Sequence, residues 1–134
     1  MTKIQDPIEL YHEALANAPA PIEDRPPTIE RAEVWPYPDL KHLWVRVQTT
    51  PFAAYPNLAL TVSDSDDQVV CTLFMVEIRE PYQSITLHLR QAPRPGALYR
   101  LAIELSRDEL ILDQRVTDFE LVFRDPTPEA TIAR

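Results

Sequence analysis

The amino-acid sequence predicts an all-β protein whose main part is an antiparallel β-sandwich of about seven strands. Three observations indicate this fold. From Ile29 onward, apolar residues recur at every second position, which is the period of a strand with one buried face. The alternating stretches are short, and turn residues separate them at regular spacing. No helical pattern intervenes, so neighbouring strands can pair directly.

Seven stretches carry this pattern, and the first of them is interrupted by Pro36. The expected strands span residues 31–37, 42–49, 57–62, 68–78, 83–89, 97–105 and 109–123. In four of them, one alternating set is apolar and is expected to face the core: Leu43, Val45 and Val47; Leu58, Leu60 and Val62; Ile85, Leu87 and Leu89; Tyr99, Leu101, Ile103 and Leu105. In the last stretch the apolar parity changes between Leu112 and Phe119, which predicts a β-bulge near residues 114–117.

The residues before the strands predict a short helix over 6–17. An Asp-Pro pair begins it, and a glutamate follows at the third position as in a capping box. One face of this helix would carry Ile8, Tyr11 and Leu15. A proline-rich, extended arm follows. This amphipathic helix is expected to dock on its own domain, to dock on a partner or a second copy, or to remain disordered.

The expected organisation is a helix and arm at residues 1–30, a sandwich at 31–125 and a C-terminal tail at 126–134. The chain has 134 residues and 45% apolar content, enough for one domain with a real core. Its start does not resemble a signal peptide, and no apolar run reaches the length of a membrane span. We therefore expect a cytoplasmic protein, unless a leader has been removed.

Composition excludes several functions. The net charge is −8, so the basic footprint for nucleic acid and the polybasic patch for a membrane surface are both missing. A single glycine, Gly96, does not suffice for a glycine-rich phosphate loop. The lone cysteine, Cys71, cannot form an internal disulfide and is expected to act as a small core residue.

The cluster of aspartates in "LTVSDSDDQVV" has some features of a calcium-binding loop. Counted from Asp64, Asp66 and Gln68 stand at ligand positions of an EF-hand. However, Val69 replaces the required glycine and Met75 replaces the bidentate glutamate. Aspartates also suit tight turns because their side chains bind nearby backbone amides. The stretch therefore predicts a hairpin turn without a calcium site.

The sequence contains no other recognisable metal-binding or catalytic motif. The histidines are His12, His42 and His88, and none stands at metal-ligand spacing from another. No nucleophile elbow, zinc-protease motif or cysteine–histidine signature occurs. The prediction is a protein that is not an enzyme and has no metal, cofactor or catalytic residue.

The stretch "PRPGALYRLAIEL", followed by a charged hairpin and a strand ending in "FELVF", resembles the last two strands of immunoglobulin-like modules. These include the fibronectin type III and macroglobulin-type β-sandwiches. "LTVSDSDDQVV" is similar to a hairpin of bacterial members, although Asp67 stands where those usually have glycine. The resemblance covers residues 31–124 and concerns architecture. It implies a tyrosine corner at Tyr99, and it implies no activity because this fold hosts many functions.

Three aromatic residues close in sequence form a candidate binding surface: Trp35, Tyr37 and Trp44. If the alternation holds, Trp44 shares an outer face with His42 and Arg46. An exposed tryptophan beside polar groups can anchor a protein partner or stack on a sugar. Alternatively, the N-terminal arm covers this residue.

The strand at 68–78 is apolar on both faces. One face would carry Val69, Cys71, Leu73 and Met75, and the other would carry Val70, Phe74, Val76 and Ile78. Because one face of a sandwich sheet normally contacts water, something is expected to cover the second face. The candidates are the arm of the same chain or a second copy in a two-fold dimer, and the dimer is slightly favoured.

Together these features predict a non-enzymatic protein-interaction or assembly module that can associate with itself. Its partner would be a protein or another copy of the chain, and neither nucleic acid nor a membrane. The alternative is a carbohydrate-binding module that uses the aromatic patch.

Overall fold

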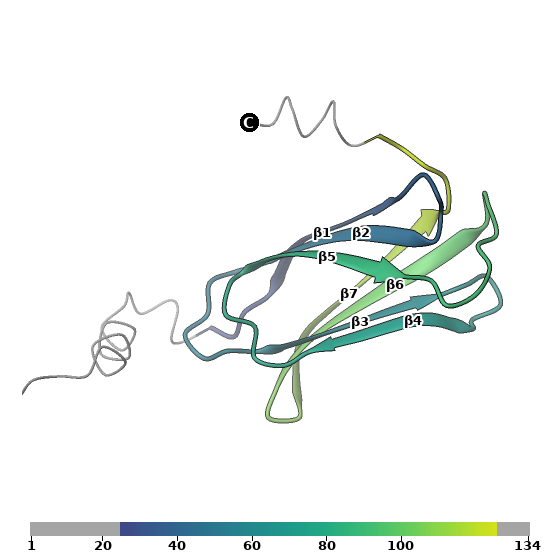
Figure 1. The fold of residues 1–134 in the computed structure, drawn as a ribbon. Helices are drawn as coiled ribbons and strands as arrows, with labels where there is room; N and C mark the ends of the chain where they lie inside the picture. The colour runs from purple at the N-terminus through teal and green to yellow at the C-terminus, as the bar shows by residue number, and fades with distance from the viewer. Residues whose placement is uncertain (1–24, 126–134) are drawn as a thin grey trace, which may run out of the picture.

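The computed structural model describes residues 25–125, which form seven strands in two layers (Figure 1). The strands are β1 (Ile29–Pro36), β2 (His42–Thr49), β3 (Asn57–Ser63), β4 (Val69–Met75), β5 (Tyr82–His88), β6 (Leu98–Arg107) and β7 (Leu110–Glu120). All seven expected strands are present, with ends shifted by a few residues. The helix expected at 6–17, including Ile8, Tyr11 and Leu15, and the tail at 126–134 lie outside the described residues.

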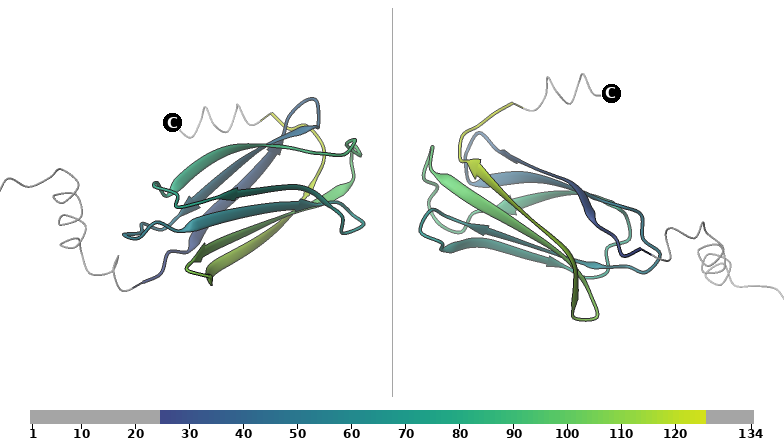
Figure 2. Two further views of the ribbon diagram at one scale, coloured as in Figure 1. Left: turned by 60° about the horizontal axis from the view of Figure 1, so that its bottom comes forward. Right: turned by 180° about the vertical axis from the view of Figure 1, so that it is seen from behind.

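The strands form two antiparallel sheets. β1, β2 and β5 make a three-stranded sheet in the order β1-β2-β5, and the other four make a sheet in the order β4-β3-β6-β7. Figure 1 shows β2 and β5 in one layer, with β3 and β4 in the other. Figure 2 shows that the β6–β7 hairpin projects past the ends of the other strands. The predicted antiparallel β-sandwich is confirmed.

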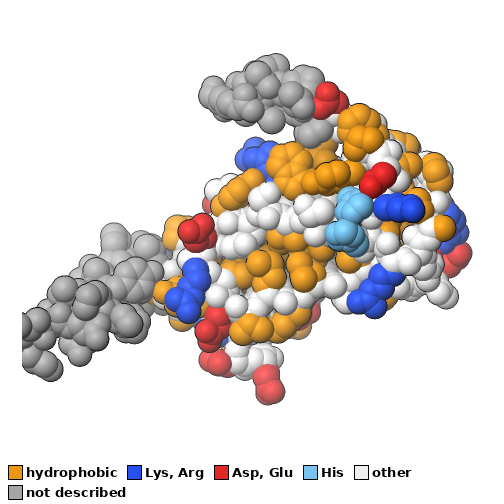
Figure 3. All heavy atoms as spheres, viewed as in Figure 1, with side chains coloured by type: hydrophobic (Ala, Val, Ile, Leu, Met, Phe, Trp, Pro, Cys, Tyr) orange, Lys and Arg blue, Asp and Glu red, His pale blue; other side chains and the backbone are white. Residues whose placement is uncertain are grey.

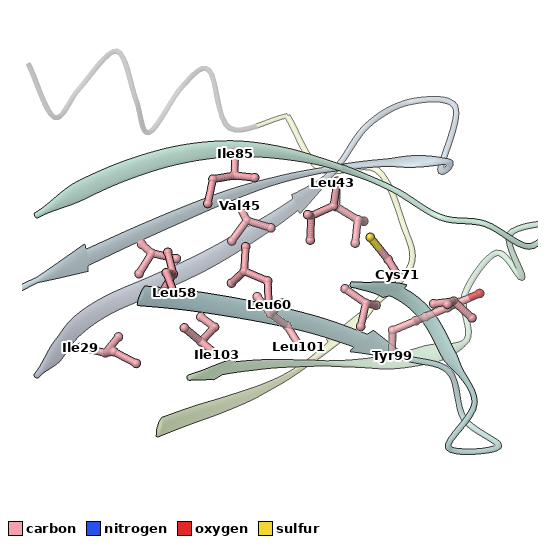
Figure 4. Close-up of a cluster of buried hydrophobic side chains, with 14 of the residues drawn as sticks. Ile29, Leu43, Val45, Leu58, Leu60, Cys71, Ile85, Tyr99, Leu101 and Ile103 are labelled. Carbon is pink, nitrogen blue, oxygen red and sulfur yellow. The ribbon is translucent and has the colours of Figure 1, made fainter. Parts of the chain in front are cut away.

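The core lies between the layers and is built from the alternating apolar positions. Side chains of both sheets point toward one another there (Figure 4). Leu43 and Val45 come from the three-stranded sheet, and Leu58, Leu60 and Leu101 come from the other; all five are almost fully buried. Burying one such side chain is worth about 1.5–3 kcal/mol, so the strict alternation of β2, β3 and β6 fixes which face turns inward.

Strand β4 departs from the expected alternation. Cys71 pairs with Val62, whereas Val69 pairs with Ser63, so Val70 is an extra residue in a β-bulge. The bulge turns Val70 and its neighbour Cys71 into the core together, with exposed fractions of 2% and 6%. The assignment of Val70 and Cys71 to opposite faces was therefore wrong. Burial also raises the pKa of the Cys71 thiol.

The same strand ends earlier than expected. β4 stops at Met75, and Glu77 takes a left-handed backbone conformation with φ +50°. The chain then turns, and the Ile78 amide donates to the Pro56 carbonyl oxygen at 2.8 Å. Ile78 is only 4% exposed, so it belongs to the core rather than to an outer face.

The bulge predicted in the last strand exists at a different place. Leu105 pairs with Asp113 and Ser106 pairs with Ile111, so the extra residue is Leu112, and residues 114–117 pair regularly. This bulge is the cause of the apolar parity change between Leu112 and Phe119, because it shifts the alternation by one residue and both side chains pack against the core. The inner positions between them include Asp113 and Arg115, which contact the edge strand β1.

This contact joins the two sheets along one side. The Ile29 amide donates to Asp113 Oδ2 at 2.7 Å, and Arg115 Nη2 donates to the Ile29 carbonyl oxygen at 2.9 Å. β1 is an edge strand, so on one side its backbone groups have no neighbouring strand to pair with. The side chains of β7 form hydrogen bonds with two of these groups instead.

The loop before β6 closes on a tyrosine corner. Tyr99 is buried, and its hydroxyl oxygen accepts a hydrogen bond of 3.1 Å from the Arg94 amide. Its ring stacks on Phe119 with centroids 5.9 Å apart. Gly96 has φ +80°, a conformation that glycine adopts at little cost. The role implied for Tyr99 by the immunoglobulin-like resemblance is confirmed.

Candidate interaction surfaces

The acidic stretch between β3 and β4 is a hairpin turn. The Asp64 amide donates to the Gln68 carbonyl oxygen at 2.9 Å, and the Asp67 amide donates to the Asp64 carbonyl oxygen at 3.0 Å. Asp64 Oδ1 accepts from the amides of Asp66 and Gln68. Asp67 has φ +60°, so it adopts the left-handed conformation for which related hairpins use glycine. The hairpin interpretation is confirmed.

The remaining oxygen of Asp64 is also engaged. Arg94 Nη2 donates to Asp64 Oδ2 at 2.7 Å and to the more exposed Asp66 Oδ2 at 3.3 Å. The backbone hydrogen bond from Gln68, followed by those from Asp66 and Arg94, lowers the pKa of Asp64 below its usual value. A carboxylate whose two oxygens are both used in this way stabilises the turn and is not poised as a catalytic base.

Two histidines distant in sequence lie together on the outer face of the three-stranded sheet. His42 of β2 pairs with His88 of β5, and their ring centroids are 4.1 Å apart. Asp39 Oδ2 lies 2.6 Å from His42 Nδ1. Figure 3 shows histidine side chains grouped beside exposed hydrophobic ones. Spacing along the chain did not predict this pair, because only the pairing of the second and fifth strands brings it together.

Between residues 25 and 125, no group of three or more His, Cys, Asp and Glu side chains is placed to hold a metal ion. The same part of the chain contains no helix long and apolar enough to cross a membrane.

The three candidate aromatic residues do come together. Trp35 of β1 pairs with Trp44 of β2, and Tyr37 follows at the end of β1. With neighbouring residues they line a hollow of about 260 Å³. Its walls are Trp35, Pro36, Tyr37, Pro38, Trp44 and Phe123, and we call this set the aromatic face. Phe123 escaped prediction because it follows β7 and reaches the face only through the fold.

Hydrogen bonds and ring contacts hold the aromatic face in place. Trp44 Nε1 donates to Ser84 Oγ at 2.8 Å, and the Tyr37 hydroxyl lies 3.3 Å from Thr86 Oγ1. The Arg46 guanidinium lies 5.2 Å from the Trp44 ring centroid, within cation–π range. Because Leu43 and Val45, which alternate with them in β2, are buried, the expectation that Trp44, His42 and Arg46 share the outer face of the sheet is confirmed. The Arg46 contact also covers part of the Trp44 ring.

The second candidate surface is smaller than the sequence suggested. Of the four residues expected on the second face of β4, Val70 and Ile78 are in the core, so they are excluded from any surface. Phe74 and Val76 remain, with exposed fractions of 59% and 67%. Phe74 lies on the outer face of the four-stranded sheet, since its register partner Ala59 alternates with the buried Leu58 and Leu60.

Beside Phe74 the outer face is hollow. A depression of about 270 Å³ extends across β3, β6 and β7. It is lined by Ala59, Thr61, Ala102, Ile103, Glu104, Gln114 and Val116. The small side chains of β3 and β6 form its floor, and the exposed Val116 stands at its far side. We call this depression, together with Phe74, the Phe74 face.

Comparison with solved structures identifies similar folds. A β-glucuronidase from Ruminococcus gnavus in complex with C6-substituted uronic isofagomine matches 70% of this chain with a TM-score of 0.54 and 14% identity. The corresponding values are 70%, 0.52 and 19% for Lactobacillus rhamnosus β-glucuronidase. They are 72%, 0.51 and 16% for a glycosyl hydrolase family 2 member from Bacteroides cellulosilyticus.

These matches concern architecture. The chain spans only 16%, 15% and 14% of the three enzymes. The matching parts are β-sandwich domains of immunoglobulin-like architecture, which confirms the expected type of fold and nothing finer. Neither a comparison with models of known protein families nor a sequence comparison with curated proteins found a match.

Proposed function

We propose that the protein is a non-enzymatic interaction module that holds an extended, proline-containing segment of a protein partner against its aromatic face. The observation that carries this proposal is the composition of the hollow, whose walls are four aromatic rings and two prolines. At about 260 Å³ it is smaller than the roughly 300–1,000 Å³ typical of small-molecule sites. This size suits inserted side chains better than a cofactor.

A proline-containing segment matches these walls chemically. Such segments adopt the polyproline II conformation before binding, so they lose little entropy when they dock in aromatic-lined grooves. Tryptophan and tyrosine are also the most frequent anchors at protein interfaces. The bonds from Trp44 to Ser84 and from Tyr37 to Thr86 hold two of the rings before a partner arrives, which reduces the cost of binding.

Charge adds a preference for the partner. The chain carries a net charge of −8, so long-range electrostatics favour the approach of basic segments over acidic ones. Beside the face, Arg46 Nη1 lies 3.7 Å from Glu33 Oε1, and Arg46 Nε donates to the Tyr82 hydroxyl oxygen at 3.0 Å. The expected partner segment therefore combines prolines with flanking lysine or arginine.

The non-enzymatic part of the proposal rests on the state of the titratable groups. The acidic turn is used structurally through Asp64 and Arg94. The pair of His42 and His88 lies on the sheet surface, and neither residue lines the hollow of the aromatic face. Neither group is arranged around a space where a substrate would react.

A carbohydrate ligand is the alternative occupant, but the geometry favours it less. A sugar ring stacks on an open aromatic face, whereas the Arg46 guanidinium lies over Trp44 at 5.2 Å. The likeness to domains of carbohydrate-active enzymes shows only the fold at 14–19% identity. The alternative is therefore an outcome that the experiment must distinguish.

The test titrates the full chain with a proline decamer flanked by lysines, while tryptophan fluorescence is recorded. A glycine–serine peptide with the same lysines controls for charge, and cellopentaose tests the alternative. We expect a saturable change with the proline peptide alone. Trp44→Ala should abolish it, and Val116→Ala on the opposite sheet should leave it unchanged, with circular dichroism verifying both folds. A response to cellopentaose alone, or no response to any of the three, would overturn the proposal.

A further inference from the structure

The histidine pair on the outer face of the three-stranded sheet occupies a close cross-strand position. Just beyond the strand ends, the Leu89 amide donates to the Lys41 carbonyl oxygen at 2.8 Å. Hydrogen-bonded and non-hydrogen-bonded pairs alternate in an antiparallel ladder, so the next pair, His42 and His88, is of the non-hydrogen-bonded kind. The Cα atoms of such a pair are about 4.5 Å apart, and its side chains are the closest across the two strands. Both imidazole rings therefore lie over the same part of the sheet.

The separation of the two rings is close to that of a chelating pair. Their centroids are 4.1 Å apart and their planes are inclined by 70°. A metal–nitrogen bond to imidazole is about 2.0–2.1 Å long, so two imidazoles on one ion have ring centroids about 4.5–5.5 Å apart. Small side-chain rotations provide the difference of about 1 Å, and the strand pairing stays unchanged. His88 is exposed and His42 is partly exposed, so an ion can reach both from solvent (Figure 3).

A carboxylate orients one of the rings. Asp39 Oδ2 lies 2.6 Å from His42 Nδ1, and Asp39 Oδ1 accepts from the amides of Lys41 and His42 at 2.9 and 3.2 Å. An exposed aspartate is ionised at neutral pH and can only accept hydrogen bonds, so Nδ1 of His42 carries the proton. In the neutral ring the lone pair is then on Nε2. Histidine ligands of metal ions are commonly oriented by a carboxylate in this way.

We propose that His42 and His88 together bind one divalent transition-metal ion, through Nε2 of His42 and one ring nitrogen of His88. Two imidazoles suit Zn²⁺, Ni²⁺ or Cu²⁺, whereas Mg²⁺ and Ca²⁺ prefer oxygen ligands. No third His, Cys, Asp or Glu between residues 25 and 125 completes the set. Water or a donor from a partner fills the remaining positions, so the ion is exchangeable and is held less tightly than in a four-ligand structural site.

The bound ion would link β2 to the edge strand β5 and stabilise the three-stranded sheet, because it binds only the folded chain. This site is separate from the one proposed for the peptide, since neither histidine lines the hollow of the aromatic face. Failure of metal binding would leave the peptide proposal intact, and failure of peptide binding would leave this one intact.

The experiment titrates the full chain, without a histidine tag, with Zn²⁺ in a calorimeter and repeats the thermal unfolding with and without the ion. We expect one ion per chain and a higher melting temperature. Asp39→Asn should weaken binding by about tenfold or more, and His42→Ala or His88→Ala should weaken it at least as much. The matched control is His12→Ala, which removes the third histidine of the chain and should bind like the unaltered protein. Mg²⁺ controls for attraction by the net charge of −8.

NMR spectra of the histidine ring nitrogens separate the orienting role of Asp39 from a structural one. Asparagine keeps an oxygen for the amides of Lys41 and His42, so Asp39→Asn preserves the turn. The unaltered chain should show the Nδ1-protonated form of the His42 ring, with Zn²⁺ shifting Nε2, and the variant should show a mixture of both forms. A chain that binds Zn²⁺ no better than Mg²⁺ would overturn the proposal. So would binding that survives in both His42→Ala and His88→Ala, or that only His12→Ala removes.

Discussion

At the scale of single residues, a few buried polar groups fix the loops of this sandwich. The Tyr99 hydroxyl holds the loop before β6 through the Arg94 amide, and Asp64 holds the turn between β3 and β4. Arg94 contributes to both, since its side chain donates to Asp64. The two loops are therefore coupled through one residue, and substitutions at either end should show effects on both.

The tyrosine corner predicts a specific loss of stability. Tyr99→Phe leaves the Arg94 amide without its acceptor and should lower the free energy of unfolding by about 1–2 kcal/mol. Tyr37→Phe, at an exposed hydroxyl, should change it by less than about 0.5 kcal/mol. Urea unfolding with unchanged slope is the measurement. Equal effects of the two substitutions would show that the corner contributes nothing.

The Asp64 carboxylate predicts a pH dependence. Its pKa in the folded state is lowered, mainly by the Gln68 amide, so its contribution to stability is present above the unfolded pKa of about 3.9. That contribution is lost as the pH falls through the lower folded value. Asp64→Asn should therefore destabilise the protein at neutral pH, and the difference should shrink in strong acid. Asp67→Asn is the control, and a pH-independent effect of Asp64→Asn would contradict the assignment.

At the scale of secondary-structure elements, predictability follows from how distinct the two faces of a strand are. Apart from Trp44, the outer positions of β2, β3 and β6 are small or polar while the inner ones are apolar, so their buried faces could be predicted. β4 is apolar on both faces, and alternation alone cannot reveal the bulge at Val70. In β7 the inward Asp113 and Arg115 bond to the edge of β1, and this contact depends on the packing of the two sheets. The His42–His88 pair and Phe123 needed the strand pairing in the same way.

The corrected course of β4 is testable by truncating its neighbours. Ile78→Ala removes core volume and should cost about 2–5 kcal/mol. Val76→Ala, two residues earlier, should stay within about 0.5 kcal/mol because its side chain is mostly in solvent. Thermal and urea unfolding of both variants provide the comparison. Similar losses for the two variants would instead support the expectation that Val76 and Ile78 lie on one covered face of the strand.

At the scale of the whole molecule, the sandwich separates two surfaces. Its core and the edge contact between β1 and β7 are formed within residues 25–125, and each sheet has its own outer face. One is the aromatic face, in which hydrogen bonds hold Trp44 and Tyr37; the other has the exposed Phe74 beside a depression. The basic, proline-containing partner that we propose would bind the aromatic face, and the net charge of −8 favours its approach.

The central claim is that the aromatic face is the binding surface. NMR spectra of the backbone amides and the tryptophan indoles test this claim most directly. The full chain is titrated with the lysine-flanked proline decamer at a fixed low protein concentration. The account predicts shifts confined to the indole signals of Trp35 and Trp44 and to amides near Tyr37 and Phe123, with β4 and β7 unchanged. Shifts concentrated on the four-stranded sheet, or an unchanged spectrum at saturating peptide, would contradict it.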